Sequence, residues 1–215
     1  MPKLPCRREG ASYFVTFRLA DSLPQSVWFQ FLAEKSHRLA ALNKTNGCKG
    51  SQPVRVPTPL EAATETVEII ERDYYRKIER YLDRGFGACH LRRPDIAAMV
   101  IEALRHFDQH QYLLDDWVVM PNHVHLILWP VPNFTLSEIL KSRKQFTATQ
   151  ANRMLGRTGQ PFWQSESFDH WIRDEAQKAR IRRYIRANPV KAGLCSSPES
   201  WPWSCAWRGG CGSRR

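Results

Sequence analysis

The stretch "YLLDDWVVMPNHVHLILW", residues 112–129, decides the fold of this chain. Two apolar runs, residues 112–120 and 123–129, are separated only by Pro121 and Asn122. Runs of this length and composition are typical of β-strands, and so short a connection joins antiparallel neighbours. The stretch therefore predicts an antiparallel β-hairpin.

Two histidines lie one residue apart in the second run. Successive side chains of a strand point to opposite faces, so His123 and His125 share a face, with Cα atoms about 6 to 7 Å apart. Two parallel imidazoles can converge on one metal ion, but such pairs are also often satisfied by carboxylates or backbone groups. The pattern indicates a metal site and leaves a structural role open. The opposite face is expected to enter the core with Val124, Leu126 and Leu128.

The rest of the chain alternates strand and helix patterns. Residues 12–20 have the alternation of a strand, and residues 161–173 contain a short one. Strands separated by helices, with one tight hairpin, predict an α+β sandwich in which helices pack on a mainly antiparallel sheet. Helices are expected at residues 24–42, 60–82, 94–107, 137–155 and 174–188, the last of them stopped by Pro189 and Gly193.

Length and composition predict one domain over residues 1–215, a size that buries a real core. Within it, residues 43–60 are rich in turn formers and are expected to be an insertion. The aromatic-rich segment "ESWPWSCAWRGG" (199–210) is expected to pack back, and an irregular tail is expected from about residue 204. The six cysteines form no CxxC pair, which argues against a zinc ribbon or a disulfide framework. Because no long apolar run or signal-peptide pattern appears, we expect a cytoplasmic protein without a membrane partner.

The net charge is the first indication of a partner. The chain has 32 Lys and Arg residues against 21 Asp and Glu residues, a formal net charge of +11 at pH 7. Such an excess favours polyanions, of which nucleic acid is the commonest. The composition therefore predicts nucleic-acid binding.

A phenol and an amide lie near the end of the last predicted helix. Tyr184 and Asn188 are four residues apart, so they are neighbours on one helical face and could aim at one point. Asn188 precedes a proline, which places it at the predicted helix end, where its side chain could reach inward. A packed tyrosine and a capping asparagine would explain the pair equally well.

Cations surround this tyrosine far more densely than anions do. A solvated helix usually mixes both signs, so we expect the excess to need an anionic partner, and nearby cations would favour the phenolate. Cations, paired histidines and a tyrosine together describe phosphoryl transfer on a nucleic-acid backbone. The residues expected to contact DNA are Lys141, Lys144, Arg180, Arg182, Arg183, Arg186 and Lys191.

Three segments in this order carry a family resemblance: "WVVMPNHVHLILWP" (117–130), "FWQSESFDHWIR" (162–173) and "RRYIRANPVKAGL" (182–194). Together they resemble the REP-associated tyrosine transposases, which belong to the single-strand DNA transposases of the IS200/IS605 type, the HUH endonucleases. The similarity runs from about residue 13 to residue 203. It implies a ferredoxin-like fold with a central antiparallel sheet.

The resemblance also assigns roles to the residues singled out above. It implies that His123 and His125 bind a divalent ion, Mg²⁺ or Mn²⁺, with Asn188 as a third ligand. Tyr184 would be the nucleophile that forms a 5′-phosphotyrosine on single-stranded or hairpin, REP-like DNA. Imidazole suits Mn²⁺ or Zn²⁺ better than Mg²⁺, so the residues leave the ion open.

Two other functions fit the same residues. One is a non-catalytic DNA- or RNA-binding regulator on this fold, which would bind without covalent adducts. The other is a metallonuclease in which the histidines activate water and Tyr184 is structural. The sequence leaves the DNA site and the choice between monomer and homodimer open.

Overall fold

The computed structural model describes residues 11–45 and 59–208, and it divides the chain into two compact units. Unit 1 combines residues 1–22 with residues 85–215, and unit 2 comprises residues 23–84. Most of the predicted insertion lies outside the described residues, as does the end of the tail. The prediction of a single domain over the whole chain stays a prediction.

Unit 1 is built on a four-stranded sheet with the order β2-β3-β1-β4. Its strands are β1 (Tyr13–Arg18), β2 (Tyr112–Val119), β3 (His123–Pro130) and β4 (Phe168–Trp171), and every neighbouring pair is antiparallel. The hairpin predicted from residues 112–129 is present as β2 and β3. With α3 between β1 and β2 and α4 between β3 and β4, the order is that of a ferredoxin-like βαββαβ sheet. The predicted α+β fold class is confirmed.

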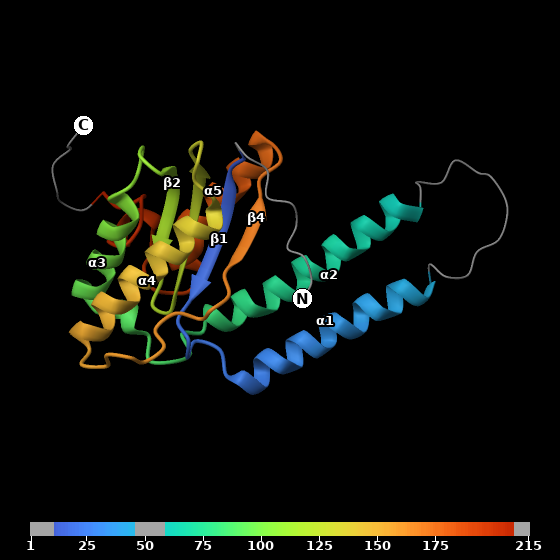
Figure 1. The fold of residues 1–215 in the computed structure, drawn as a ribbon, viewed down its shortest axis with the longest axis horizontal. Helices are drawn as coiled ribbons and strands as arrows, with labels where there is room; N and C mark the ends of the chain where they lie inside the picture. The colour runs from blue at the N-terminus through green and yellow to red at the C-terminus, as the bar shows by residue number, and fades with distance from the viewer. Residues whose placement is uncertain (1–10, 46–58, 209–215) are drawn as a thin grey trace. The chain divides into compact units, whose positions relative to one another are not determined.

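Helices cover both faces of this sheet (Figure 1). One face packs against α3 (Pro94–Arg105) and α4 (Leu136–Met154), and the opposite face packs against α5 (Glu175–Lys191). The short helices η1 (His90–Arg92) and η2 (Pro198–Ser200) belong to the connections. As predicted from strand alternation, the α3–α4 face of β3 carries Val124, Leu126 and Leu128.

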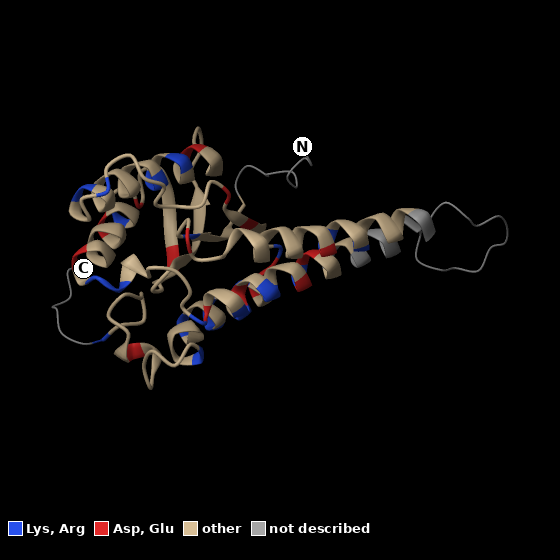
Figure 2. Ribbon diagram, turned by 90° about the horizontal axis from the view of Figure 1, so that it is seen from below, with Lys and Arg blue, Asp and Glu red and all other residues tan. Residues whose placement is uncertain are grey.

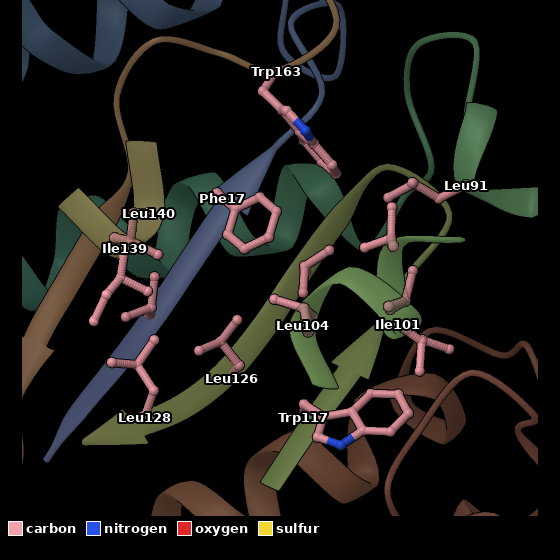
Figure 3. Packing of buried hydrophobic residues seen from close by; sticks show 14 of the residues in the cluster. Phe17, Leu91, Ile101, Leu104, Trp117, Leu126, Leu128, Ile139, Leu140 and Trp163 are labelled. Carbon is pink, nitrogen blue, oxygen red and sulfur yellow. The ribbon is translucent and has the colours of Figure 1, made fainter. Parts of the chain in front are cut away.

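The larger core lies between the sheet and the α3–α4 pair. Figure 3 shows Phe17 and Leu126 of the sheet among side chains of both helices, with Trp163 packed on Phe17 at 4.8 Å between ring centroids. This apolar layer fixes β3 from one side. The opposite face of β3 packs against α5, and this face carries His123 and His125.

A β-bulge interrupts the pairing of β2 with β3. Leu114 pairs with Leu128 but Trp117 pairs with Leu126, so β2 has one extra residue between these pairs. The extra residue falls at Asp115 and Asp116, and both carboxylates bind cations of α5. Strict alternation would have put them on opposite faces, so the bulge is what turns both toward α5.

The last helix is longer than predicted. Asp174 caps α5 by accepting from the Gln177 amide, and the helix continues through Pro189 to Lys191 before Gly193 adopts a positive φ of 69°. Pro189 costs one backbone hydrogen bond in the last turn without ending the helix. The predicted stop at Pro189 was therefore wrong, whereas Gly193 follows the helix end as expected.

The aromatic tail packs back onto β2, as predicted. The Trp201 indole donates to the Val119 carbonyl at 3.0 Å, and the Val119 amide donates to the Trp203 carbonyl at 2.7 Å. Ser204 forms an isolated antiparallel bridge with Val118. The tail thus covers the outer edge of β2, a strand edge that would otherwise be open.

Unit 2 is a pair of helices, α1 (Gln25–Thr45) and α2 (Pro59–Leu82), which lie side by side (Figure 1). Leu23, Tyr74, Ile78 and Leu82 form its buried core, and Trp28 packs against them. Both helices were predicted, with ends within three residues of those observed. Across the part of the chain that is described, no helix is long and apolar enough to cross a membrane.

Candidate active site

The two histidines of β3 face each other beneath α5. His123 and His125 are 1% and 0% exposed, and their Nε2 atoms lie 3.1 Å apart. Both rings sit on the face of β3 opposite the main core, as strand alternation predicted. The structure thus brings two imidazole nitrogens to one point inside the protein.

Each imidazole is oriented through its other nitrogen. His123 Nδ1 lies 2.7 Å from Asn122 Oδ1, and the Asn122 amide nitrogen in turn donates to the Phe86 carbonyl at 3.0 Å. Because the Asn122 oxygen can only accept, His123 Nδ1 carries the proton and Nε2 keeps its lone pair. His125 Nδ1 lies 2.7 Å from Thr16 Oγ1, so the same tautomer is available to it.

Burial keeps both imidazoles neutral. It lowers the pKa of His123 to about 3 and the pKa of His125 well below its ordinary value, and nearby Lys191 lowers both further. The neighbouring His123 adds to the effect on His125. A neutral imidazole with a lone pair on Nε2 is the form that binds a metal ion.

Tyr184 reaches this pair from α5. Its hydroxyl lies 3.4 Å from His125 Nε2, and its ring meets Phe14 and His125 edge to face at centroid distances of 6.0 and 5.3 Å. The Lys191 ammonium lies 5.7 Å from the centre of the Tyr184 ring. The tyrosine residue is partly exposed, and its hydroxyl lies at the histidines.

Asn188 lies one turn after Tyr184 and is 1% exposed. Its amide nitrogen and amide oxygen are both buried, and neither has a hydrogen-bond partner among the described residues. The expected freedom of this side chain at a helix end was wrong, because α5 continues beyond it. Buried polar groups are normally hydrogen-bonded, so an unsatisfied amide on the histidine-facing side of α5 needs a missing partner.

These residues fit a divalent cation. The described residues contain no cluster of three or more His, Cys, Asp or Glu side chains that could hold a metal, so any ligand set here must be mixed. Two neutral imidazole nitrogens and the unsatisfied Asn188 oxygen supply such a set. An ion bound there would give the Asn188 oxygen a partner and relieve the facing lone pairs of His123 and His125.

Three of the predicted DNA-binding cations are engaged within the protein. Arg182 forms a bidentate pair with Asp115 at 2.6 and 3.1 Å, and Arg186 does the same with Asp116 at 2.6 and 3.0 Å. The expectation that the cations of α5 need an external anion was therefore wrong for these two, since β2 supplies the carboxylates. Burial raises the pKa of Asp115, but the hydrogen bonds and positive charges of Arg182 and Lys178 outweigh it and hold that pKa below its ordinary value.

Lys144 is the third cation with an internal role. Its ammonium donates to the carbonyls of residues 164 and 165, at 2.7 and 2.9 Å, and to the Ser167 hydroxyl at 3.0 Å. Burial lowers its pKa to about 8. Lys144 thus ties the lead-in of β4 to α4. The remaining predicted contacts are exposed and stay candidates for DNA: Lys141, Arg180, Arg183 and Lys191.

Thr16, Asn122 and the bulge carboxylates were missed by reasoning from the sequence. Asn122 directly precedes the first histidine, so its position beside the pair was a usable signal. Thr16 had no such signal, because only the register of β1 on β3 places it opposite His125. The bulge on β2 likewise leaves no clear mark in the sequence.

Comparisons with known proteins agree with the resemblance. Residues 93–188 match the family described as IS200-like transposases, and this range contains the histidines, Tyr184 and Asn188. A Haemophilus influenzae protein described as a REP-associated tyrosine transposase is 29% identical over 98 residues, which cover 40% of this chain and 54% of that protein. The resemblance is thus confirmed over this part of the chain. The proteins that it resembles are described as transposases.

This chain matches only about half the length of that curated relative. Among solved structures, a REP-associated tyrosine transposase bound to a REP hairpin aligns with a TM-score of 0.46 at 19% identity, over 95% of this chain and 82% of that one. A Deinococcus radiodurans protein described as a transposase aligns with a TM-score of 0.31 at 14% identity, over 87% of this chain and 98% of that one.

Proposed function

We propose that the protein is a metal-dependent single-strand DNA transposase that cleaves and rejoins DNA through a 5′-phosphotyrosine on Tyr184. The observation that carries the proposal is the meeting of a partly exposed tyrosine with two buried, neutral imidazoles, its hydroxyl 3.4 Å from His125 Nε2. This contact joins His125 of β3 to Tyr184 of α5, which are 59 positions apart in the sequence. A tyrosine with a purely structural role would not need two buried imidazoles beside its hydroxyl.

In the proposed reaction the Tyr184 oxygen attacks the phosphorus of a DNA phosphodiester. The bond from phosphorus to the 3′ oxygen breaks, the phenol proton leaves to solvent, and the released 3′ oxygen takes up a proton. Because the new tyrosyl ester keeps the phosphodiester linkage, a 3′-hydroxyl can reverse the step without a nucleotide cofactor. In this reaction the DNA strand would approach from the partly exposed side of Tyr184.

His123, His125 and Asn188 would hold the ion, which we propose to be Mg²⁺ or Mn²⁺. When bound, it would neutralise phosphate charge and polarise a non-bridging oxygen. Asn122 and Thr16 would keep the imidazoles in the tautomer that presents Nε2. Lys191, beside the Tyr184 ring, would add positive charge where the phosphate sits.

We propose hairpin DNA with a single-stranded segment as the substrate. A structure described as a REP-associated tyrosine transposase is bound to a REP hairpin, and the curated relative is described as a transposase of the same kind. The net charge of +11 suits such a polyanion. We propose that the protein acts in the cytoplasm, as a monomer or a homodimer.

The test is the covalent adduct. Full-length protein is incubated with end-labelled hairpin oligonucleotides and Mn²⁺ or Mg²⁺, and the products are separated under denaturing conditions. We expect an adduct with the wild type and none with Tyr184→Phe, which removes one oxygen and keeps the ring. Tyr81→Phe, a change at a tyrosine of α2, is the matched control and should leave the adduct unchanged.

The two rival functions predict different results. Cleavage by Tyr184→Phe at the wild-type rate would make water the nucleophile and establish the metallonuclease. Tight binding of many hairpins by both proteins, with no cleavage by either, would establish the non-catalytic regulator. Either result would overturn the proposal.

A further inference from the structure

A row of four arginines runs along α2 in unit 2. Arg72, Arg76 and Arg80 lie within the helix, Arg84 lies just beyond its last residue, and all four are exposed. Four residues advance a helix by about 6 Å and return the side chain to nearly the same face. The arginines therefore form one ridge of guanidinium groups along unit 2.

This ridge lies opposite the buried side of the helix. The residues of α2 that pack inward also repeat every four positions, and they are Ile70, Tyr74, Ile78 and Leu82. The arginine row begins two positions later, which is about 200° around the helix axis. The row consequently faces away from α1 rather than contributing to the core that joins the two helices.

Three acidic residues of unit 2 form ion pairs that join its two helices. Lys35 pairs with Glu71 at 3.3 Å and Arg38 with Asp73 at 3.2 Å, and both pairs join α1 to α2. Lys77 pairs with Glu34 in the same way. Figure 2 shows basic and acidic residues along unit 2, and the ion pairs named above join α1 to α2.

Within the described part of the chain, no carboxylate forms an ion pair with any arginine of the row. Arg80 Nε donates to the Arg76 carbonyl at 3.3 Å, which leaves both charges uncompensated. A helix dipole favours cations in the last turn and so accounts for Arg80 and Arg84, but its effect falls off before Arg76 and Arg72. Four like charges on one ridge repel one another unless an anion is present.

We propose that this arginine row binds the phosphate backbone of the DNA on which the candidate active site acts. The inference rests on the proposed function for its choice of DNA as the polyanion. A guanidinium presents a fork of donors that matches phosphate oxygens, and a series spaced by about 6 Å can engage successive phosphates. Contacts to phosphates position the nucleic acid without reading its sequence.

The experiment compares full-length proteins that differ only in this row. All binding is measured in a Tyr184→Phe background, so that cleavage cannot affect the result. One variant carries Gln at positions 72, 76, 80 and 84, and its matched control carries Lys at the same positions. The affinity for a hairpin oligonucleotide with a single-stranded extension is measured at salt concentrations from about 50 to about 300 mM. Affinity that depends on phosphate contacts falls steeply over this range.

We expect the Gln variant to bind about 10- to 100-fold more weakly near physiological salt, and its slope of log K against log salt to shrink by about 3, since each phosphate contact contributes about 0.7 to 0.9. The Lys variant should keep most of the slope because its charge is unchanged. Should four Gln residues impair folding, the pairs at 72 and 80 and at 76 and 84 are each expected to lose about half of that slope.

An unchanged slope and affinity in the folded Gln variant would overturn the proposal. Loss of binding to phosphatidylserine vesicles with DNA binding intact would overturn it as well, because the row would then serve a membrane surface. Adduct formation is scored separately with Tyr184 intact. A reduced salt slope in the Gln variant, without any adduct from the wild type, would support DNA binding by the arginine row and refute the proposed cleavage reaction. An adduct from the wild type with an unchanged slope in the Gln variant would support the reaction and refute DNA binding by the row.

Discussion

The pair of Arg186 with Asp116 gives the sharpest prediction about α5, because it separates a structural arginine from a DNA-binding one. Asp116 is 5% exposed and accepts two hydrogen bonds from Arg186, at 2.6 and 3.0 Å. Arg186→Ala leaves this buried carboxylate without its cation. Hydrogen bonds to charged groups contribute about 1.5 to 3 kcal/mol, and the half-exposed arginine puts the expected loss near the lower end, about 2 kcal/mol.

For a chain of this size, a loss of about 2 kcal/mol lowers the unfolding midpoint by about 4 to 8 °C. Thermal unfolding followed by tryptophan fluorescence measures this shift. Arg183→Ala is the matched control, since Arg183 is exposed on the same helix and no described carboxylate pairs with it. The control should unfold like the wild type yet bind DNA more weakly.

A second variant makes the reasoning refutable. Adding Asp116→Asn to Arg186→Ala removes the stranded charge, so the double variant should regain about half of the lost stability. Equal midpoints for Arg186→Ala and Arg183→Ala would show that the pair adds nothing. A double variant less stable than Arg186→Ala would show that the buried carboxylate is not what makes the single change costly.

Four further variants test the same structure. His125→Ala should abolish metal-dependent cleavage while retaining most DNA affinity, and full cleavage by this variant in Mn²⁺ would refute the metal site. If the Asn188 amide is a ligand, Asn188→Ala should weaken Mn²⁺ binding by about 10-fold, measured by calorimetry. Lys144→Met should destabilise the protein by about 1 to 3 kcal/mol, with Lys141→Met as a neutral control. Burial lowers the pKa of Lys144 to about 8, so between this pH and the ordinary pKa of a lysine the unfolded chain binds more protons than the folded one. The free energy of unfolding of the wild type, relative to Lys144→Met, should therefore rise with pH over that interval and stay constant below it. Gly87→Ala should cost about 1 kcal/mol or more in a denaturant titration, since φ is 87° there and a Cβ would lie 2.7 Å from the Asp21 carbonyl oxygen.

Local periodicity alone determined much of the candidate site. The alternation of a strand put His123 and His125 on one face and their neighbours in the core, and the structure agrees. The helical repeat put Tyr184 and Asn188 on one side of α5. These relations depend only on the repeat of a strand or a helix, so they can be read from spacing without knowledge of the rest of the fold.

What only the tertiary structure decided are the relations between segments far apart in the chain. The placement of α5 over β3 brings Tyr184 to His125, and the register of β1 on β3 gives His125 its partner Thr16. The bulge in β2 turns Asp115 and Asp116 toward α5, where they take up arginines that the sequence had assigned to DNA. Register, bulges and helix placement depend on how both faces of the sheet pack, and a local sequence pattern does not contain that information.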